Sequence, residues 1–336
     1  MAARAELDQQ GPLRMGTLGA AQITEQGLIL PARAIEGVEV VAIAARERDR
    51  AERYALRHGI PEVFASYEAL LASPNVDAIY NPLPNALHHR WTLAALRAGK
   101  HVLCEKPMAA NAREAEEMAR VADEEGRILA EAVHYRYHPM ATRIKELVES
   151  GALGKLEHIE ARMRVPVPAD NIRRSYALAG GSIMDPGCYP LQMLRFFGGE
   201  TPEILEASAR TSAPDLDVEA SARFRFASGA TGAMEASMDH DGLEIELRIR
   251  GQGGELFANN PVLPHLFNEL RVRIGDEETR EVVEGEPTFT AQLRAFAGWI
   301  RGGTPMPTDA WEAVRNMQLI DSVYTAAGLP LRGLGK

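Results

Sequence analysis

The chain contains only two cysteines, Cys104 and Cys188, among its 336 residues. Two thiols cannot build a disulfide framework or a four-thiolate zinc site, so we expect both to be reduced and buried. No run of about 18 apolar residues is present, and residues 1–16 lack an apolar core of signal-peptide length. These absences predict a cytoplasmic protein that does not bind a membrane.

A surplus of basic residues is also absent. Lysine and arginine number 37 against 47 aspartates and glutamates, which leaves a net charge of −10. Nucleic-acid binders need a basic face, so DNA and RNA are not expected partners. The hydrophobic content of 46% and the charged content of 25% are typical of a globular protein. A chain of this length exceeds the size at which single cores stop growing, which predicts two domains.

In the first half, apolar runs of strand length alternate with helical stretches. Strands are predicted at Leu13–Leu18, Val38–Ala44, Val63–Phe64, Val76–Tyr80, Val102–Cys104 and Ile128–Val133. Helices are predicted at Glu25–Ile35, Glu47–His58, Tyr67–Ala72, Ala86–Arg97 and Ala112–Glu125. This alternation predicts a Rossmann-type, doubly wound parallel sheet, which binds ligands at the carboxyl ends of its strands.

The first of these ends carries a glycine turn that partly matches the dinucleotide pattern G-x-G-x-x-G/A. Gly19 takes the first position, Ala21 the second and Thr24 the third. After the second strand, Ala45-Arg46 stands where a fold that prefers NAD places an acid. A guanidinium there suits the 2′-phosphate of NADP. The alternative is that Arg46 only lies on the exposed helix that follows.

Two further strand ends carry conspicuous residues. Asn81 to Asn85 contains two prolines, which predicts a stiff loop beside a cofactor, and Asn85 is predicted to cap the helix whose first turn holds His88. The strand Val102–Cys104 ends in Glu105-Lys106-Pro107. Because Pro107 restricts the residue before it to an extended conformation, Lys106 should be held at the strand's carboxyl end.

The second half predicts an α+β domain with a large, mostly antiparallel open sheet. Strands are predicted at Lys155–Val165, Ile204–Ser212, Ala220–Phe226, Ala230–Met238, Glu244–Arg250 and Glu281–Val283. Helices are predicted at Met140–Ser150, Thr288–Arg301 and Asp309–Ala327. We expect a disordered lead at 1–12, a dinucleotide domain at 13–134 and a substrate-binding and oligomerisation domain at 135–336. The sheet should leave an apolar face for a second subunit.

Between the first two of those strands lies Gly180 to Tyr189, which contains the motif Asp185-Pro186-Gly187-Cys188-Tyr189. If Pro186 begins a helix, Asp185 is its N-cap and Tyr189 lies one turn further along the same face. An acid and a phenol would then point together. The alternative is that Asp185 only caps and Tyr189 packs in the core.

Residues 19–21, 81–88, 98–107 and 180–189 together resemble the Gfo/Idh/MocA oxidoreductase family. Within it, Ala44-Ala45-Arg46 and the final tyrosine of the D-x-G-x-Y motif resemble the branch of dimeric dihydrodiol dehydrogenases and NADP-dependent xylose dehydrogenases. The resemblance implies hydride transfer between NADP, with NAD as the alternative, and a secondary alcohol of a sugar or cyclic polyol. It also implies a homodimer or homotetramer.

The resemblance further implies roles for individual residues. Lys106, Asp185 and Tyr189 would be catalytic, with Tyr189 exchanging the proton, Lys106 beside the reacting oxygen and Asp185 orienting or polarising. Weaker candidates for substrate contact are Tyr135, Arg136, Arg173 and Tyr176. The cofactor would contact Gly19, Ala20, Ala21, Ile23, Ala45, Arg46, Asn81, Leu83, Asn85, His88, Glu105 and Lys106.

Two other functions remain open at this point. A metal-dependent hydrolase could use His134 and His138 with Glu131 or Asp185, although Pro139 disfavours a shared helical face for the two histidines. We therefore expect no metal site. A non-catalytic regulator that senses a dinucleotide could use the same scaffold, because a fold does not determine a function.

Overall fold

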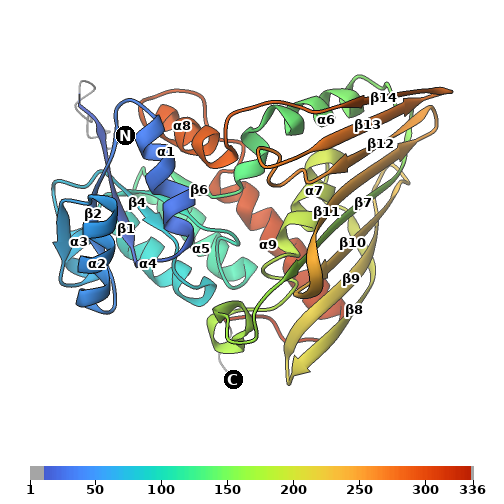
Figure 1. Cartoon of the computed structure of the whole chain (residues 1–336). Coiled ribbons are helices and arrows are strands. Elements are labelled where there is room, and N and C mark those ends of the chain that lie inside the picture. Colours follow the sequence, from blue (N-terminus) through green and yellow to red (C-terminus); the bar gives the residue numbers. More distant parts are fainter. Residues whose placement is uncertain (1–10, 334–336) are drawn as a thin grey trace. The chain divides into compact units, whose positions relative to one another are not determined.

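The computed structural model describes residues 11–333, so the predicted disordered lead lies almost wholly outside the described residues. The chain forms two compact units. One contains the residues up to Val133 together with Phe289–Val314, and the other contains His134–Thr288 and the residues from Arg315 onward. Figure 1 shows the elements of both, coloured along the sequence. Residues 289–314 therefore belong to the first unit, although they follow the strands of the second unit in the sequence.

The first unit contains a parallel sheet with the strand order β3-β2-β1-β4-β5-β6. Its strands are β1 (Leu13–Leu18), β2 (Val38–Ala44), β3 (Glu62–Phe64), β4 (Ala78–Asn81), β5 (His101–Cys104) and β6 (Leu129–Glu131). The chain steps outward from β1 through β2 to β3 and then crosses to β4 on the other side. This is the doubly wound order of dinucleotide-binding folds, so the predicted fold of this half is confirmed.

Helices connect these parallel strands. They are η1 (Glu25–Ile29), α1 (Leu30–Ala34), α2 (Arg48–His58), α3 (Tyr67–Leu71), α4 (Asn85–Arg97) and α5 (Ala112–Glu124), and α8 (Thr288–Ile300) joins them from later in the chain. In α5, the Asn111 side chain accepts the Glu114 N–H, and Ala115, Met118 and Ala122 form a buried stripe. Spacing of three and four residues places such side chains on one face of a helix.

Two predicted helix starts are corrected by the structure. The helix expected at Glu25–Ile35 begins as a π-helical turn, where a Cβ on Gly27 would lie 2.2 Å from the Tyr80 hydroxyl oxygen. Asn85 is not a cap, because α4 begins at Asn85 itself and Pro84 occupies the N-cap position without a side-chain hydrogen bond. Proline fixes an extended φ that suits a chain entering a helix.

The second unit contains an eight-stranded sheet in the order β14-β13-β12-β11-β7-β10-β9-β8. Its strands are β7 (Leu156–Pro166), β8 (Glu203–Ala213), β9 (Leu216–Arg225), β10 (Thr231–Ser237), β11 (Asp239–Gly251), β12 (Gly254–Asn259), β13 (Glu269–Ile274) and β14 (Glu277–Glu281). All pairs are antiparallel except β7 with β10. The mostly antiparallel sheet is confirmed, but β12 and β13 were not expected, and the last strand ends at Glu281 rather than beginning there.

The helices of this unit cover the sheet or lead into it. They are η2 (His134–Tyr137), α6 (Pro139–Glu149), η3 (Ile172–Arg174), η4 (Tyr176–Leu178), α7 (Cys188–Gly198) and α9 (Ala310–Ala326), of which α9 begins in the first unit. Helix α7 packs on β7 and β10, over an apolar sheet face that includes Ile159, Ala161 and Met234. No helix in the described part of the chain has the length and apolarity needed to cross a membrane.

The opposite face of the sheet is charged, and the expectation of an apolar open face is wrong. Arg162 and Arg164 of β7 each form ion pairs with Glu235 of β10 and with Glu244 of β11. Because side chains alternate along a strand, buried apolar residues such as Ile159 and Met234 point to the helix side and the charged residues to the other, where the Phe257 ring packs against Arg248 and Arg271. The homodimer or homotetramer stays a prediction, which sedimentation at micromolar protein concentration would test.

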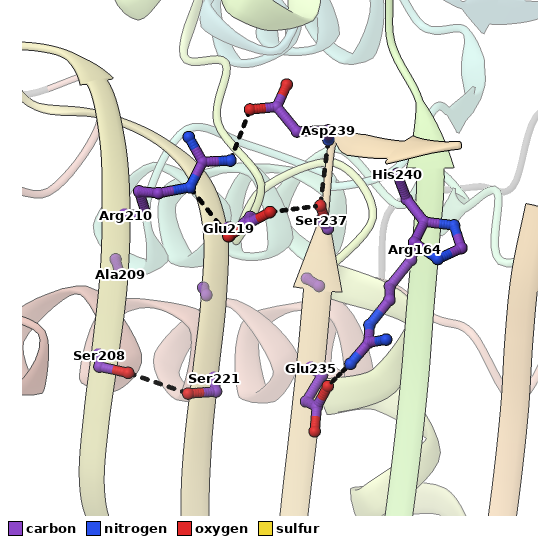
Figure 2. A pocket seen from close by; sticks show the side chains of 12 residues that line it. Arg164, Ser208, Ala209, Arg210, Glu219, Ser221, Glu235, Ser237, Asp239 and His240 are labelled. Carbon is purple, nitrogen blue, oxygen red and sulfur yellow. Dashed lines mark hydrogen bonds and ion pairs between the residues drawn. The ribbon is translucent and has the colours of Figure 1, made fainter. Parts of the chain in front are cut away.

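Figure 2 shows a pocket on this charged face. Arg210 of β8 donates to Glu219 at 2.9 Å and to Asp239 at 2.6 Å, and the Ser237 hydroxyl donates to Glu219 at 3.3 Å. None of the predicted site residues lines this pocket. This pocket is therefore distinct from the residues that the motifs single out.

Candidate active site

In the first unit, β1, β2, β4 and β5 are parallel, so their carboxyl ends lie at one edge of the sheet. The turn after β1 has Gly19 in the left-handed conformation, with φ +86°, and Gly19 donates to the Ala44 carbonyl at 2.6 Å. Helix α2 holds the next two residues, because Arg50 donates to the Ala20 carbonyl at 2.9 Å and the Tyr54 hydroxyl donates to the Ala21 carbonyl at 3.4 Å. The turn is thus held in a fixed shape from outside.

The loop after β4 packs against this turn. A Cβ on Gly19 would lie 3.2 Å from a methyl group of Leu83, so two predicted cofactor residues are neighbours. Asn81 is fully buried and its amide donates to Thr92 Oγ1 at 3.0 Å and to the His88 carbonyl at 3.3 Å. Asn85 and Ile23 are half-buried. Asn81 therefore fixes the loop from within, whereas Leu83, Asn85 and Ile23 remain partly accessible.

His88 is also fully buried. Its Nδ1 lies 2.9 Å from the Pro107 carbonyl oxygen, and its Nε2 lies 2.6 Å from the Leu83 carbonyl oxygen. Burial lowers the pKa of His88 to about 4, and the positive charge of Lys106 acts in the same direction. The imidazole is neutral at pH 7 and therefore donates to only one of these two carbonyls, while its ring packs between the loop after β4 and the segment after β5. Its direct contact with a cofactor stays a prediction.

The segment after β5 carries Glu105 and Lys106. Glu105 is buried, and its carboxylate accepts the Tyr80 hydroxyl at 2.7 Å, so this acid is tied to β4. Lys106 is half-buried and is joined to Pro107 by a cis peptide bond. As the motif predicts, Lys106 lies at the carboxyl end of a central parallel strand.

At the end of β2, Ala45 is buried and Arg46 extends into solvent with its side chain 88% exposed. Its guanidinium has a long contact of 3.5 Å with Glu47. An exposed guanidinium at this strand end, together with the left-handed glycine after β1, fits a dinucleotide that carries a 2′-phosphate.

In the second unit, the loop that carries Asp185 does not form the predicted helix start. Helix α7 begins at Cys188 after Gly187, and tight turns precede it, with the Gly187 N–H donating to the Ser182 carbonyl at 2.7 Å. A Cβ on Gly187 would lie 2.6 Å from the Ile183 carbonyl oxygen, which only glycine permits. Asp185 is therefore not the N-cap of α7.

The structure instead pairs Asp185 with another predicted residue. The Arg173 guanidinium lies 2.9 Å from the Asp185 carboxylate, which is mostly buried, while Arg173 is about half exposed. An arginine beside a carboxylate holds it ionised and fixes its direction. Arg173 is placed to position Asp185, a role that the motif did not reveal.

Tyr189 is 5% exposed, and its hydroxyl oxygen lies 3.2 Å from His134 Nε2. Tyr135 is fully buried, bonds to Gln192 through its hydroxyl, and has its ring centroid 6.3 Å from that of Tyr189. Tyr135 thus supports the Tyr189 ring by packing. The motif interpretation missed the His134 contact, although His134 follows β6 directly and was noted as a potential ligand.

The other candidates for substrate contact stack on side chains of their own unit. The Arg136 guanidinium lies over the Phe196 ring at 3.9 Å from its centroid. The Arg332 guanidinium lies 4.7 Å from the centroid of the Tyr176 ring. Neither contact tests a role in substrate binding, which stays a prediction for both residues.

The two histidines of the hydrolase alternative have different partners. His134 bonds Tyr189, whereas His138 Nδ1 accepts the Met140 N–H at the start of α6. Among residues 11–333, no group of three or more His, Cys, Asp or Glu side chains is placed to hold a metal ion. Cys104 and Cys188 are both buried, as expected, and neither takes part in a disulfide.

A buried ion pair anchors the loop that carries Asp185 and Tyr189. Asp217 of β9 and Arg332 are both fully buried and paired, and Asp217 also accepts the Ser182 hydroxyl at 2.9 Å and the Ile183 N–H at 2.7 Å. The Tyr324 hydroxyl donates to the same carboxylate at 3.2 Å. Residues far apart in sequence therefore hold the start of this loop.

Replacing Arg332 by Met should destabilise the protein by about 3–5 kcal/mol, because it leaves the Asp217 carboxylate buried without its cation. Adding Asp217→Asn to Arg332→Met should recover part of that loss, since no buried charge then remains. Urea unfolding of the three proteins measures this. As a control, Arg210→Met in the solvent-exposed pairs of β8 should change stability little. Equal stability of Arg332→Met and wild type would show that the pair contributes nothing.

The fold and these residues define a two-unit protein whose first unit has a doubly wound parallel sheet and whose second unit holds the Arg173–Asp185 ion pair and a buried tyrosine, Tyr189, in contact with His134. Comparison with known families agrees. Residues 13–133 match the model described as the oxidoreductase family with NAD-binding Rossmann fold, and residues 141–257 match the GFO/IDH/MocA C-terminal domain. The chain belongs to the Gfo/Idh/MocA oxidoreductase family, as its motifs predicted.

Individual relatives extend over nearly the whole chain. D-xylose 1-dehydrogenase (NADP+) 2 of Haloferax volcanii is 36% identical over 319 residues, which cover 94% of this chain and 97% of that enzyme. The trans-1,2-dihydrobenzene-1,2-diol dehydrogenase of Sus scrofa is 36% identical over 60% of each chain. A 3-ketoreductase from Actinomadura kijaniata, solved with NADP and TDP-benzene, has a TM-score of 0.88 and 31% identity, covering 94% of this chain and 98% of that one. The prediction of an oxidoreductase is confirmed, and the expected cofactor agrees with these relatives.

Proposed function

We propose that this protein is an NADP-dependent dehydrogenase that converts a secondary alcohol of a sugar or cyclic polyol to the ketone, or catalyses the reverse. The observation that carries the proposal is Lys106 at the carboxyl end of β5 in a dinucleotide-binding sheet. The nicotinamide cofactor, when bound, accepts or supplies the hydride. The residues of this chain must then bind and orient the cofactor and the substrate, and they must exchange the proton.

The proton is the part of the reaction that the side chains have to manage. Lys106 of the first unit and Tyr189 of the second handle it, with Tyr189 exchanging the proton and Lys106 supplying a positive charge that favours an anionic oxygen. Asp185, held by Arg173, orients or polarises the substrate hydroxyl. The dinucleotide would be held by the turn of Gly19, Ala20 and Ala21, by Leu83 beside that turn, and by the exposed guanidinium of Arg46.

The substrate class is supported by relatives that include the xylose dehydrogenase and a dTDP-3,4-didehydro-2,6-dideoxy-α-D-glucose 3-reductase of Actinomadura kijaniata, which is 32% identical to this chain. A screen of sugars and polyols that starts with D-xylose, with the absorbance of reduced nicotinamide as the signal, tests the proposal. Turnover with at least one sugar supports a dehydrogenase. Cofactor binding without turnover of any sugar or polyol would favour the dinucleotide-sensing regulator instead.

Arg46 should determine the preference for NADP over NAD. Replacing it by Ala should weaken NADP binding by about ten- to a hundredfold and leave NAD binding nearly unchanged, because a hydrogen bond to a charged group contributes about 1.5–3 kcal/mol. Fluorescence titration with both cofactors measures the change. Arg48→Ala is the matched control, since Arg48 is exposed two residues further on and pairs with Glu52 at 2.8 Å. Equal losses for both cofactors would contradict the assignment.

A further inference from the structure

A continuous row of hydrogen-bonding groups extends from the hydroxyl of Tyr189. That hydroxyl lies 3.2 Å from His134 Nε2, and His134 Nδ1 lies 2.9 Å from the Thr288 hydroxyl oxygen. The same Thr288 oxygen lies 3.3 Å from His265 Nδ1. All four residues belong to the second unit, although they are drawn from η2, α7, α8 and the segment between β12 and β13.

The row leads from the protein interior to its surface. Tyr189 and His134 are 5% and 3% exposed, and Thr288 is fully buried. His265 is half-buried and lines a pocket on the surface of the second unit, where His138 and three consecutive residues, 266–268, also contribute. Leu266, beside His265, is 63% exposed, so this end of the row reaches solvent.

The groups in the row can all donate and accept in one consistent direction. Tyr189 donates its O–H to His134 Nε2, His134 donates its Nδ1–H to Thr288 Oγ1, and Thr288 donates its O–H to His265 Nδ1. A neutral imidazole has one donor and one acceptor nitrogen, and a hydroxyl has both functions, so no link conflicts with the next. Burial lowers the pKa of His265, which keeps that imidazole neutral and able to accept at pH 7.

We propose that Tyr189, His134, Thr288 and His265 form a proton relay between the active-site phenol and the surface pocket. The proposal rests on the proposed role of Tyr189 in catalysis. It also supplies what a phenol lacks, since a group with a pKa of about 10 is a poor base at neutral pH. If Tyr189 passes its own proton to an imidazole as it receives one from the substrate, it never has to exist as a free phenolate.

The transfer balances with one proton entering and one leaving. In alcohol oxidation the substrate O–H bond breaks and its proton bonds to the Tyr189 oxygen, while the hydride leaves to the cofactor. The Tyr189 proton moves to His134 Nε2, the His134 Nδ1 proton to Thr288, and the Thr288 proton to His265 Nδ1. The His265 Nε2 proton then passes to water or buffer in the pocket. Ketone reduction runs the same transfers backward.

The test compares how fast protons and reduced cofactor appear in a single turnover. The full-length enzyme is mixed with NADP and the sugar accepted in the screen, in weak buffer with a pH-indicator dye, and both absorbances are followed by stopped flow. Thr288→Val removes the middle link and keeps the side-chain volume, and it should slow proton release by about tenfold or more. Thr288→Ser, which restores the hydroxyl, should recover most of the rate. Thr290→Val, at another buried threonine of α8, should release protons at the wild-type rate.

A second variant tests the surface end and does not depend on the folding of a core variant. His265→Ala should slow proton release, and imidazole added to the solution should restore it by occupying the open pocket. Imidazole should not restore proton release in Thr288→Val, because the missing hydroxyl lies inside the protein. Leu266→Ala, which truncates a neighbouring side chain of the pocket, should release protons at the wild-type rate. Proton release at the wild-type rate in both Thr288→Val and His265→Ala overturns the relay.

The outcome for Tyr189→Phe separates this proposal from the proposed function. If Tyr189→Phe is strongly impaired while Thr288→Val and His265→Ala release protons normally, the relay is wrong and the catalytic role of Tyr189 stands. If Tyr189→Phe keeps the wild-type rate, the role of Tyr189 itself is wrong, and the relay fails with it.

Discussion

Replacing Tyr189 by Phe is expected to lower kcat by about 10²- to 10⁴-fold and to leave NADP affinity near wild type. The substitution removes only the hydroxyl that lies 3.2 Å from His134, and the buried ring keeps its packing beside Tyr135. The loss should therefore appear in kcat rather than in stability. The loss in kcat arises because phenylalanine has no group that can exchange the proton.

A second substitution, Tyr189→His, should lower kcat less than Tyr189→Phe does. Imidazole exchanges protons with a pKa near 6.5, so it can replace the phenol as acid and base, and the optimum should move toward lower pH. Measuring kcat against pH for wild type and both variants, with one accepted sugar, checks this. If Tyr189→Phe keeps the wild-type rate and pH profile, the proton leaves by another residue, and Lys106 becomes the leading candidate.

Lys106→Met should lower kcat at least as much as Tyr189→Phe does. Methionine keeps the length and apolar stem of the side chain but removes the ammonium that stabilises negative charge on the reacting oxygen. The kcat and KM values should be measured separately, because a residue that acts in the transition state lowers kcat, whereas one that only binds raises KM. Lys155→Met, at an exposed lysine of the second unit, is the control and should behave as wild type.

Lys106→Met also has a readout that is independent of turnover. The positive charge of Lys106 contributes to the low pKa of His88, after the larger effect of burial. Removing that charge should raise the pKa of His88 above about 4, although burial should still hold it below the ordinary value of 6.5. An NMR titration of the His88 ring measures the change. An unchanged pKa together with an unchanged kcat would place the lysine ammonium away from both His88 and the reaction.

Much of the first unit could be predicted because its signals are local. All six strands were expected within two residues of their observed ends, since each is a short apolar run followed by a break such as Gly19 or Pro82. The position of Lys106 needed only the strand before it and the proline after it. Errors arose where packing overrode local preference, as at Gly27, whose close approach to Tyr80 accompanies the π-helical turn.

The second unit shows the limit of local reasoning more clearly. The Asp185 motif has the residues of a helix N-cap, but the backbone contacts around Gly187 place two tight turns there and start the helix at Cys188. The open face of the sheet was expected to be apolar, yet buried residues such as Ile159 of β7 and Leu247 of β11 alternate with charged residues that occupy that face. The turn contacts to Ser182 and Ile183 and the pairing of the strands set these directions, and the residue types alone did not reveal either.

From the amino-acid sequence alone, the chain length predicted two domains, the alternating local patterns predicted the parallel sheet, and the motifs identified Lys106, Asp185 and Tyr189 as candidates. Only the tertiary structure decided what those side chains contact. His134 and Thr288 are 154 positions apart, and Arg332 and Asp217 are 115 positions apart. No local pattern encodes such pairs, since they depend on how whole helices and strands pack, and that packing gives Tyr189 its histidine and the Asp185 loop its anchor.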